Sequence, residues 1–232
     1  MSQQTTDQPQ AKQPLLVETT LMVAELFRSI QGESTHAGRP CTLIRLAGCP
    51  LRCRWCDTPF AHEGGRPMTL DQIVEAVEAL GDKLVEVTGG EPLAQAATPG
   101  FLRALCDAGY EVLLETGGSI DLAPVDPRVV KILDVKCPGS GEHHRNLWHN
   151  LDLLGVRDEV KFVLADRADY EWACRQVGQR GLDRAPHTLL FSPVHDRLHP
   201  AELARWILDD RLPVRLQVQL HRYLWPDRAR GV

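Results

Sequence analysis

The residues best suited to chemistry are three cysteines at the spacing C-x3-C-x2-C, namely Cys49, Cys53 and Cys56. Thiolates are soft ligands that favour zinc and iron–sulfur clusters. A disulfide framework does not fit, because three is an odd number and the intervening loops are too short for all to pair. Structural zinc sites usually have four protein ligands, whereas a reactive centre keeps one position open. The spacing therefore indicates a soft metal centre with a free position, such as an iron–sulfur cube held by three cysteines.

A second candidate is the turn Gly89-Gly90-Glu91-Pro92, which follows an apolar segment at residues 84–88. Two glycines let a strand turn sharply and bring bare backbone close to a ligand. The N–H groups of such a turn can bind a carboxylate or an amino-acid backbone. Taken alone the turn is a weak signal, and its position after the cysteine loop gives it weight.

Helices and strands must bring these residues together. Along the chain, apolar residues recur alternately with the period of a strand and with the period of a helix. About six such units predict parallel strands with crossover helices. Polar residues then gather at the carboxyl edge of the strands, where ligands bind in α/β folds. The predicted strands are 21–27, 40–48, 84–88, 110–115, 129–135, 160–164, 187–191 and 214–219, and the predicted helices are 69–80, 99–109, 144–154, 169–180 and 200–209.

We expect a disordered leader at residues 1–20, one domain at 21–226 and a tail at 227–232. The net charge of −5 gives no reason to expect a nucleic-acid backbone as partner. No apolar run approaches the roughly 18 residues of a membrane span. Residues 1–14 lack the apolar region of a secretory signal. Together with reduced thiols, these features predict a cytoplasmic protein.

Arg45 lies inside the apolar run of the second predicted strand. A buried arginine is costly unless it is paired. Arg45 is therefore either a residue of an edge strand or an anion-binding group that faces a cavity.

The three-cysteine loop followed by the Gly89–Pro92 turn resembles the radical S-adenosylmethionine (SAM) superfamily. The resemblance implies a partial (β/α)6 barrel of the TIM type that carries a 4Fe–4S cluster. The three cysteines would each hold one iron, and SAM would chelate the fourth. Reduction of the cluster would cleave SAM to methionine and a 5′-deoxyadenosyl radical that abstracts hydrogen from the substrate.

Further strings are similar to the 7-carboxy-7-deazaguanine synthase family: residues 27–33 (FRSIQGE), 37–40 (AGRP), 45–49 (RLAGC), 56–58 (CDT), 88–93 (TGGEPL) and 219–223 (QLHRY). The similarity implies a lyase that contracts the ring of 6-carboxy-5,6,7,8-tetrahydropterin with loss of ammonia. The product, 7-carboxy-7-deazaguanine, is a precursor of queuosine. The similarity also implies regenerated SAM, assistance by Mg²⁺, an electron donor such as flavodoxin and a homodimer.

By the same resemblance, the residues divide into three groups. Thr58 would contact Mg²⁺ through its hydroxyl, with most other oxygens coming from substrate and water. The substrate would contact Ile30, Gln31, Gly32, Glu33, Arg45, Thr88 and, as a weak candidate, Pro226. SAM would contact Gly90, Asp134, Lys136, Ser140, Ser192, Pro193, Val194 and His195.

The sequence departs from the family pattern at three points. The first two cysteines have the short spacing, whereas some members carry an insertion there. Residues 134–140 match only some members, and other members end soon after a segment like 219–223, while this chain continues to Val232.

Two alternatives remain from the sequence. A radical SAM activase that forms a glycyl radical on a partner protein would share the cysteines but would not need Gln31, Gly32, Glu33 and Arg45. A zinc-binding interaction module of Cys49, Cys53, Cys56 and His62 would explain the cysteines but not the α/β pattern.

Overall fold

The computed structural model describes residues 19–228 and 230–232. The leader predicted at residues 1–20 lies almost entirely outside these residues. No helix within the described part of the chain combines the length and hydrophobicity that a membrane span requires.

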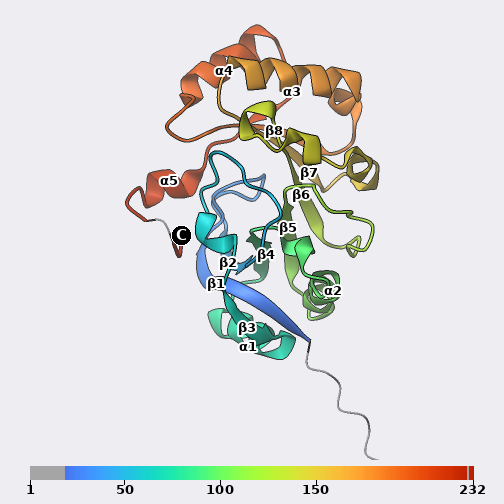
Figure 1. Cartoon of the computed structure of the whole chain (residues 1–232), viewed down its shortest axis with the longest axis vertical. Coiled ribbons are helices and arrows are strands. Elements are labelled where there is room, and N and C mark those ends of the chain that lie inside the picture. The colour runs from blue at the N-terminus through green and yellow to red at the C-terminus, as the bar shows by residue number, and fades with distance from the viewer. Residues whose placement is uncertain (1–18, 229) are drawn as a thin grey trace, which may run out of the picture.

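One nine-stranded sheet organises the molecule, with the order β3-β1-β2-β4-β5-β6-β7-β8-β9 (Figure 1). Its strands are β1 (Thr20–Ile30), β2 (Pro40–Leu46), β3 (Arg66–Thr69), β4 (Leu84–Gly89), β5 (Glu111–Thr116), β6 (Val130–Val135), β7 (Glu159–Leu164), β8 (Thr188–Pro193) and β9 (Arg215–Leu216). The strands β3, β1 and β2 pair antiparallel, and every pair from β2 to β9 is parallel. This mixed α/β open sheet confirms the predicted fold class.

The helices are α1 (Leu70–Leu80), α2 (Thr98–Asp107), α3 (Arg167–Gln179), α4 (Pro200–Asp209) and α5 (Leu220–Leu224). The predicted start of α1 is confirmed by a reciprocal capping box. The Thr69 hydroxyl accepts from the Gln72 backbone N–H at 3.2 Å, and the Gln72 side chain accepts from the Thr69 N–H at 3.0 Å. Gly81 ends the helix with a φ of 79°, a conformation that glycine adopts without strain.

The prediction of a helix at residues 144–154 is wrong, because two 3₁₀ segments, His143–Arg145 and Trp148–Leu153, take its place. The buried Asn150 accounts for the difference, since its amide binds the backbone of a neighbouring loop. Its oxygen accepts from the Leu122 N–H at 3.0 Å, and its nitrogen donates to the Ile120 carbonyl at 2.9 Å. These tertiary bonds override the local helical pattern.

Three short elements near the sheet edges also differ from expectation. The edge strand β3 was not predicted; it contains Pro67, a residue that edge strands tolerate. The predicted last strand, 214–219, shortens to the two residues of β9, and the helix α5, which was not predicted, follows it.

The two faces of the sheet carry different residues, because successive side chains of a strand point to opposite sides. One face packs against the helices and is apolar. The other face begins with a small apolar cluster of Cys41, Leu43, Leu84, Leu113, Val130 and Ile132. Two residues further along the strands, this inner face becomes polar, with Arg45, Glu86, Glu115, Asp134 and Lys161 among the residues around a cavity. On this face, successive side chains two residues apart therefore belong first to the apolar core and then to the site.

Candidate functional site

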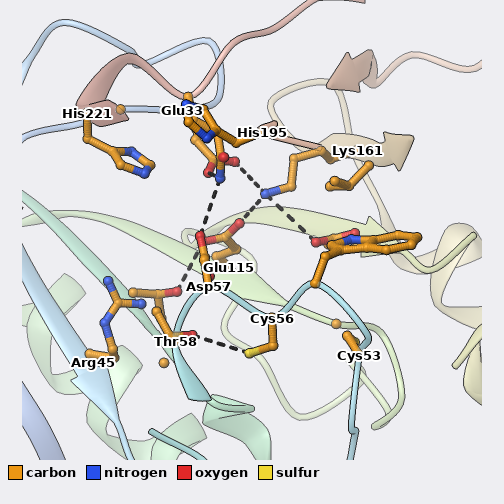
Figure 2. Close-up of a pocket in the computed structure, with 18 of the residues that line it drawn as sticks. Glu33, Arg45, Cys53, Cys56, Asp57, Thr58, Glu115, Lys161, His195 and His221 are labelled. Carbon is orange, nitrogen blue, oxygen red and sulfur yellow. Dashed lines mark hydrogen bonds and ion pairs between the residues drawn. The ribbon is translucent and has the colours of Figure 1, made fainter. Parts of the chain in front are cut away.

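A cavity of about 440 Å³ opens at the carboxyl ends of the parallel strands. It gathers segments that are far apart in sequence: the turn after β1, the cysteine loop after β2, the inner face of β4 to β7 and the C-terminal segment. Figure 2 shows side chains from these segments directed toward one another. The cavity lies where the alternating pattern predicted a ligand site.

The three cysteines all line this cavity and have free thiols. Their loop is attached to the segment after β6, since Arg54 N–H donates to the Ser140 carbonyl at 3.0 Å and Arg52 N–H donates to Glu142 at 3.0 Å. Burial raises the pKa of Cys53 to about 11. Metal binding at this thiol therefore has to displace a proton.

The arrangement of the thiols fits a cluster better than a single ion. No three Cys, His, Asp or Glu side chains converge on one ion position within residues 19–228 and 230–232. His62 lines the cavity but completes no such group. Three thiols distributed over one wall suit a ligand of several metal atoms, because each sulfur can then hold a different atom.

The double-glycine turn packs directly on the start of the cysteine loop. Gly90 N–H donates to the Leu46 carbonyl at 2.9 Å, and Glu91 N–H donates to the Gly48 carbonyl at 2.8 Å. A Cβ on Gly90 would lie 2.3 Å from the Gly48 oxygen, so no larger residue fits. The turn therefore brings bare backbone to the edge of the cavity, but the N–H groups of Gly90 and Glu91 are already bound within the protein and differ in this from the prediction.

Glu91 of this turn has a structural role. Its fully buried carboxylate accepts hydrogen bonds from the Thr116 hydroxyl at 2.9 Å, from Gly117 N–H at 2.8 Å and from Leu93 N–H at 3.1 Å. These bonds join the end of β4 to the end of β5 and position the glycines.

Three side chains donate hydrogen bonds to Glu33. Its carboxylate accepts from Lys161 at 2.7 Å, from Gln217 at 3.0 Å and from Gln219 at 2.9 Å. Burial alone would raise the pKa of Glu33, but the Lys161 ammonium outweighs it and the pKa falls to about 2. Glu33 is therefore ionised at neutral pH and can accept hydrogen bonds from a ligand.

Lys161 is the central cation of the site, with a side chain only 3% exposed. It binds both Glu33 and Glu115 (Figure 2). Its ammonium lies 3.9 Å from Asp134. Lys136 also binds Asp134, at 2.9 Å. Of the two Asp134 oxygens, Oδ1 is buried and has no hydrogen-bond partner within the described residues. This oxygen is available to a donor group of a ligand.

The structure decides whether Arg45 is a residue of an edge strand or a group that faces a cavity. Its strand, β2, lies between β1 and β4, so Arg45 is not on an edge. Its Nε donates to Glu25 at 2.8 Å, which satisfies the buried charge in part. The rest of the guanidinium borders the cavity (Figure 2).

Most of the residues predicted for the site line the cavity. They are Ile30, Gln31, Gly32, Glu33, Arg45, Cys49, Cys53, Cys56, Thr58, Thr88, Gly90, Asp134, Lys136, Val194 and His195.

Four predicted residues are not part of the cavity wall. The Ser140 hydroxyl donates to the Cys137 carbonyl at 2.6 Å, and Ser192 is buried within β8. Pro193 borders a neighbouring hollow, and Pro226 is exposed. In place of Pro226, the C-terminal segment contributes His221, Arg222, Arg228 and Val232 to the wall.

Among the wall residues that the sequence did not predict are three charged ones on the strands, Glu86, Glu115 and Lys161. Each has an apolar residue on both sides or on one side in its strand, at a position whose neighbours face the helices. A charged residue at such a position was the available signal, the same one that drew attention to Arg45.

Comparison with known proteins agrees with this geometry. Residues 43–183 match the model of the Radical SAM superfamily. The 7-carboxy-7-deazaguanine synthase of Chlorobaculum tepidum is 49% identical over 93% of this chain and 99% of its own. The enzyme of the same name from Koribacter versatilis is 44% identical over 91% of this chain and 100% of its own.

The crystal structure of QueE from Escherichia coli has the same fold, with a TM-score of 0.71 and 22% identity over 87% of this chain and 95% of that one. Because the family model covers more than half of the chain and the relatives nearly all of it, the chain belongs to the radical SAM superfamily and, within it, to the 7-carboxy-7-deazaguanine synthase family.

Proposed function

We propose that the protein contracts the ring of 6-carboxy-5,6,7,8-tetrahydropterin to 7-carboxy-7-deazaguanine with release of ammonia. The observation that carries the proposal is the joining, in one cavity, of three free thiols with a charged set that suits a carboxylated, nitrogen-rich ring. The names of the close relatives support the same reaction. A glycyl-radical activase, which acts on a partner protein, would not need that charged set.

Membership of the radical SAM superfamily implies a 4Fe–4S cluster and SAM as cofactors. When bound, they supply the radical chemistry of hydrogen abstraction. Cys49, Cys53 and Cys56 would hold the cluster. Gly90 would offer its backbone carbonyl to SAM, because its N–H is bound to Leu46, and the free oxygen of Asp134 would accept a hydrogen bond from the SAM amino group.

The charged residues would orient the substrate. Arg45 would bind the pterin carboxylate, because a guanidinium offers paired N–H donors to two carboxylate oxygens. Glu33 and Glu115 would accept hydrogen bonds from the ring N–H and amino groups. Lys161 keeps these two carboxylates in place.

Thr58 would be the protein's contact to Mg²⁺. Its hydroxyl lies 3.8 Å from the Cys56 sulfur and borders the cavity beside Asp57 (Figure 2). Mg²⁺ keeps most of its oxygen ligands from water and substrate, so one hydroxyl is a sufficient protein contribution.

We expect Thr58→Ala to raise the Mg²⁺ concentration needed for half-maximal turnover by about tenfold, as loss of one metal contact does. The measurement is the rate of product formation against Mg²⁺ concentration. Cluster absorbance should stay unchanged and serves as the control. An unaltered Mg²⁺ dependence would remove Thr58 from the metal site.

The central test is a turnover assay. Protein reconstituted anaerobically with iron and sulfide, then reduced, should convert carboxytetrahydropterin to carboxydeazaguanine in the presence of SAM and Mg²⁺, as followed by mass spectrometry. Formation of 5′-deoxyadenosine without the deazapurine would overturn the proposed substrate but would leave the assignment to the radical SAM superfamily unchanged. A zinc module would show no brown charge-transfer absorbance.

The proposal includes an electron donor such as flavodoxin, a homodimer and a cytoplasmic location. Light scattering of the purified protein tests the dimer. Turnover with reduced flavodoxin in place of a chemical reductant tests the donor.

A further inference from the structure

Glu86 is a buried carboxyl group with no cation of its own. It lies on the inner face of β4, where it is 3% exposed and has apolar register partners on both sides, Leu43 of β2 and Leu113 of β5. Its one hydrogen bond within the described residues comes from the Gln31 amide nitrogen to Oε2, at 2.5 Å. The other oxygen, Oε1, is left for the cavity that Glu86 lines.

The orientation of the Gln31 amide is determined by its second contact. Its oxygen accepts from the Glu33 backbone N–H at 2.9 Å, and a backbone N–H can only donate. The Gln31 nitrogen must therefore face Glu86. Gln31 thus offers Glu86 a donor and no positive charge.

The charges that surround Glu86 are already committed to other groups. From β7, Lys161 is shared by Glu33 and Glu115, and from β2, Arg45 is paired with Glu25. The thiol of Cys41 on β2 is the remaining titratable neighbour. Ionisation of Glu86 would place a third negative charge beside Glu33 and Glu115.

The expected consequence is a carboxyl group that keeps its proton at neutral pH. Burial is the largest cause, and the charges of Glu115 and Glu33 add to it, so that the pKa of Glu86 rises to about 8. A protonated carboxyl has an O–H donor, whereas a carboxylate can only accept.

We propose that Glu86 is a specificity-determining residue, which as a neutral carboxylic acid donates a hydrogen bond to an acceptor on the pyrimidine ring of the bound pterin, its carbonyl oxygen above all. The inference rests on the proposed function. Glu33 and Glu115 accept from the N–H and amino groups of the ring, and Glu86 supplies the donor that a carbonyl requires. If the ring carried an amino group in place of the carbonyl, the N–H donors of that group would face the O–H donor of Glu86, and the two could not form a hydrogen bond.

The test is the pH profile of kcat/KM for the reconstituted holoenzyme and two variants. In the wild type, kcat/KM should fall as pH rises through about 8, because ionisation removes the donor. Glu86→Gln should lack this alkaline fall, because an amide donates at any pH. Glu86→Leu should lower kcat/KM by about 10-fold to 100-fold across the range, mainly through KM, as loss of a buried hydrogen-bond partner does.

Two further readouts do not depend on turnover. Infrared difference spectra of wild type against Glu86→Gln should show the carbonyl stretch of a protonated carboxyl at pH 7 and its loss above about pH 8. Competition by the analogue with an amino group at the carbonyl position should be weak in the wild type and should strengthen, relative to the parent pterin, in Glu86→Leu.

The matched control is Glu75→Gln, the same change on the exposed side of α1. It should reproduce the wild-type pH profile. Cluster absorbance and circular dichroism establish that each variant is folded and loaded. An alkaline fall retained by Glu86→Gln, or a Glu86→Leu variant with wild-type KM, would overturn the role of Glu86 while the proposed function stands. A wild type that makes no deazapurine would overturn both.

Discussion

Replacing Cys53 by Ala will abolish both SAM cleavage and product formation. The thiol lies in the middle of the loop that lines the cavity, with Cys49 and Cys56 on either side. Within the described residues, no group of three Cys, His, Asp or Glu side chains is arranged to hold one metal ion and so to replace the cysteine loop as a metal site. Loss of one of three ligands therefore leaves a cluster without the support that keeps it in the protein.

The measurement is the charge-transfer absorbance after anaerobic reconstitution, together with iron content and 5′-deoxyadenosine formation. Cys106→Ala is the matched control, because Cys106 is a free thiol on α2, outside the cavity wall. The control should keep the cluster and full activity. A Cys53→Ala protein that retained cluster absorbance and SAM cleavage would show that the loop does not hold the cluster.

The sequence predicts the parts of this site that are local. The cysteine spacing and the Gly89–Pro92 turn are short motifs, and the structure places both at the cavity. The same holds for α4, whose predicted range of 200–209 matches Pro200–Asp209, because Pro200 suits the first turn of a helix.

The parts that depend on register could not be predicted. Glu86, Glu115 and Lys161 line one cavity only because of the register between the strands that carry them, in which Glu86 is paired with Leu113, Glu115 with Ile132 and Lys161 with Asp134. A single strand shows which of its residues share a face, but not how far it is shifted against its neighbours. The charges could therefore be noticed one by one, as Arg45 was, and not as a network.

The C-terminal segment shows a second limit of sequence patterns. No helix or strand was predicted for residues 220–226, yet this segment packs against the turn after β1 (Figure 1). Leu220 N–H donates to the Gly32 carbonyl at 2.9 Å, and a Cβ on Gly32 would lie 2.4 Å from the His221 ring. Such tertiary contacts leave no periodic signal, because they join single residues across the whole length of the chain.

Replacing Lys161 by Met will lower both the stability of the fold and the activity of the enzyme. The substitution keeps the side-chain volume but removes the cation between Glu33 and Glu115. Breaking a buried ion pair on one side costs about 3–5 kcal/mol of unfolding free energy. Glu33 would also lose the position from which it is proposed to bind substrate, so we expect kcat/KM to fall by about 100-fold or more.

The Lys161→Met substitution should also change how the unfolding free energy depends on pH. In the wild type, the lowered pKa of Glu33 stabilises the fold at pH values above 4.5, which is the ordinary pKa of a glutamate. This contribution to the unfolding free energy is lost as the pH falls toward about 2. Without Lys161, burial instead favours the protonated carboxyl, so that the folded variant gains stability as the pH is lowered. The difference in unfolding free energy between wild type and variant should therefore be largest near pH 7 and shrink below about pH 5.

Lys131→Met is the matched control for this experiment. Lys131 is also buried and binds Asp158 at 2.9 Å, but it lies on β6 with its side chain away from the cavity. Its loss should destabilise the fold to a comparable extent, as urea denaturation will measure, while the folded enzyme keeps its kcat/KM. Equal losses of activity in the two variants would mean that Lys161 acts through stability alone. A selective loss in Lys161→Met would instead show that this ammonium positions the carboxylates for the substrate.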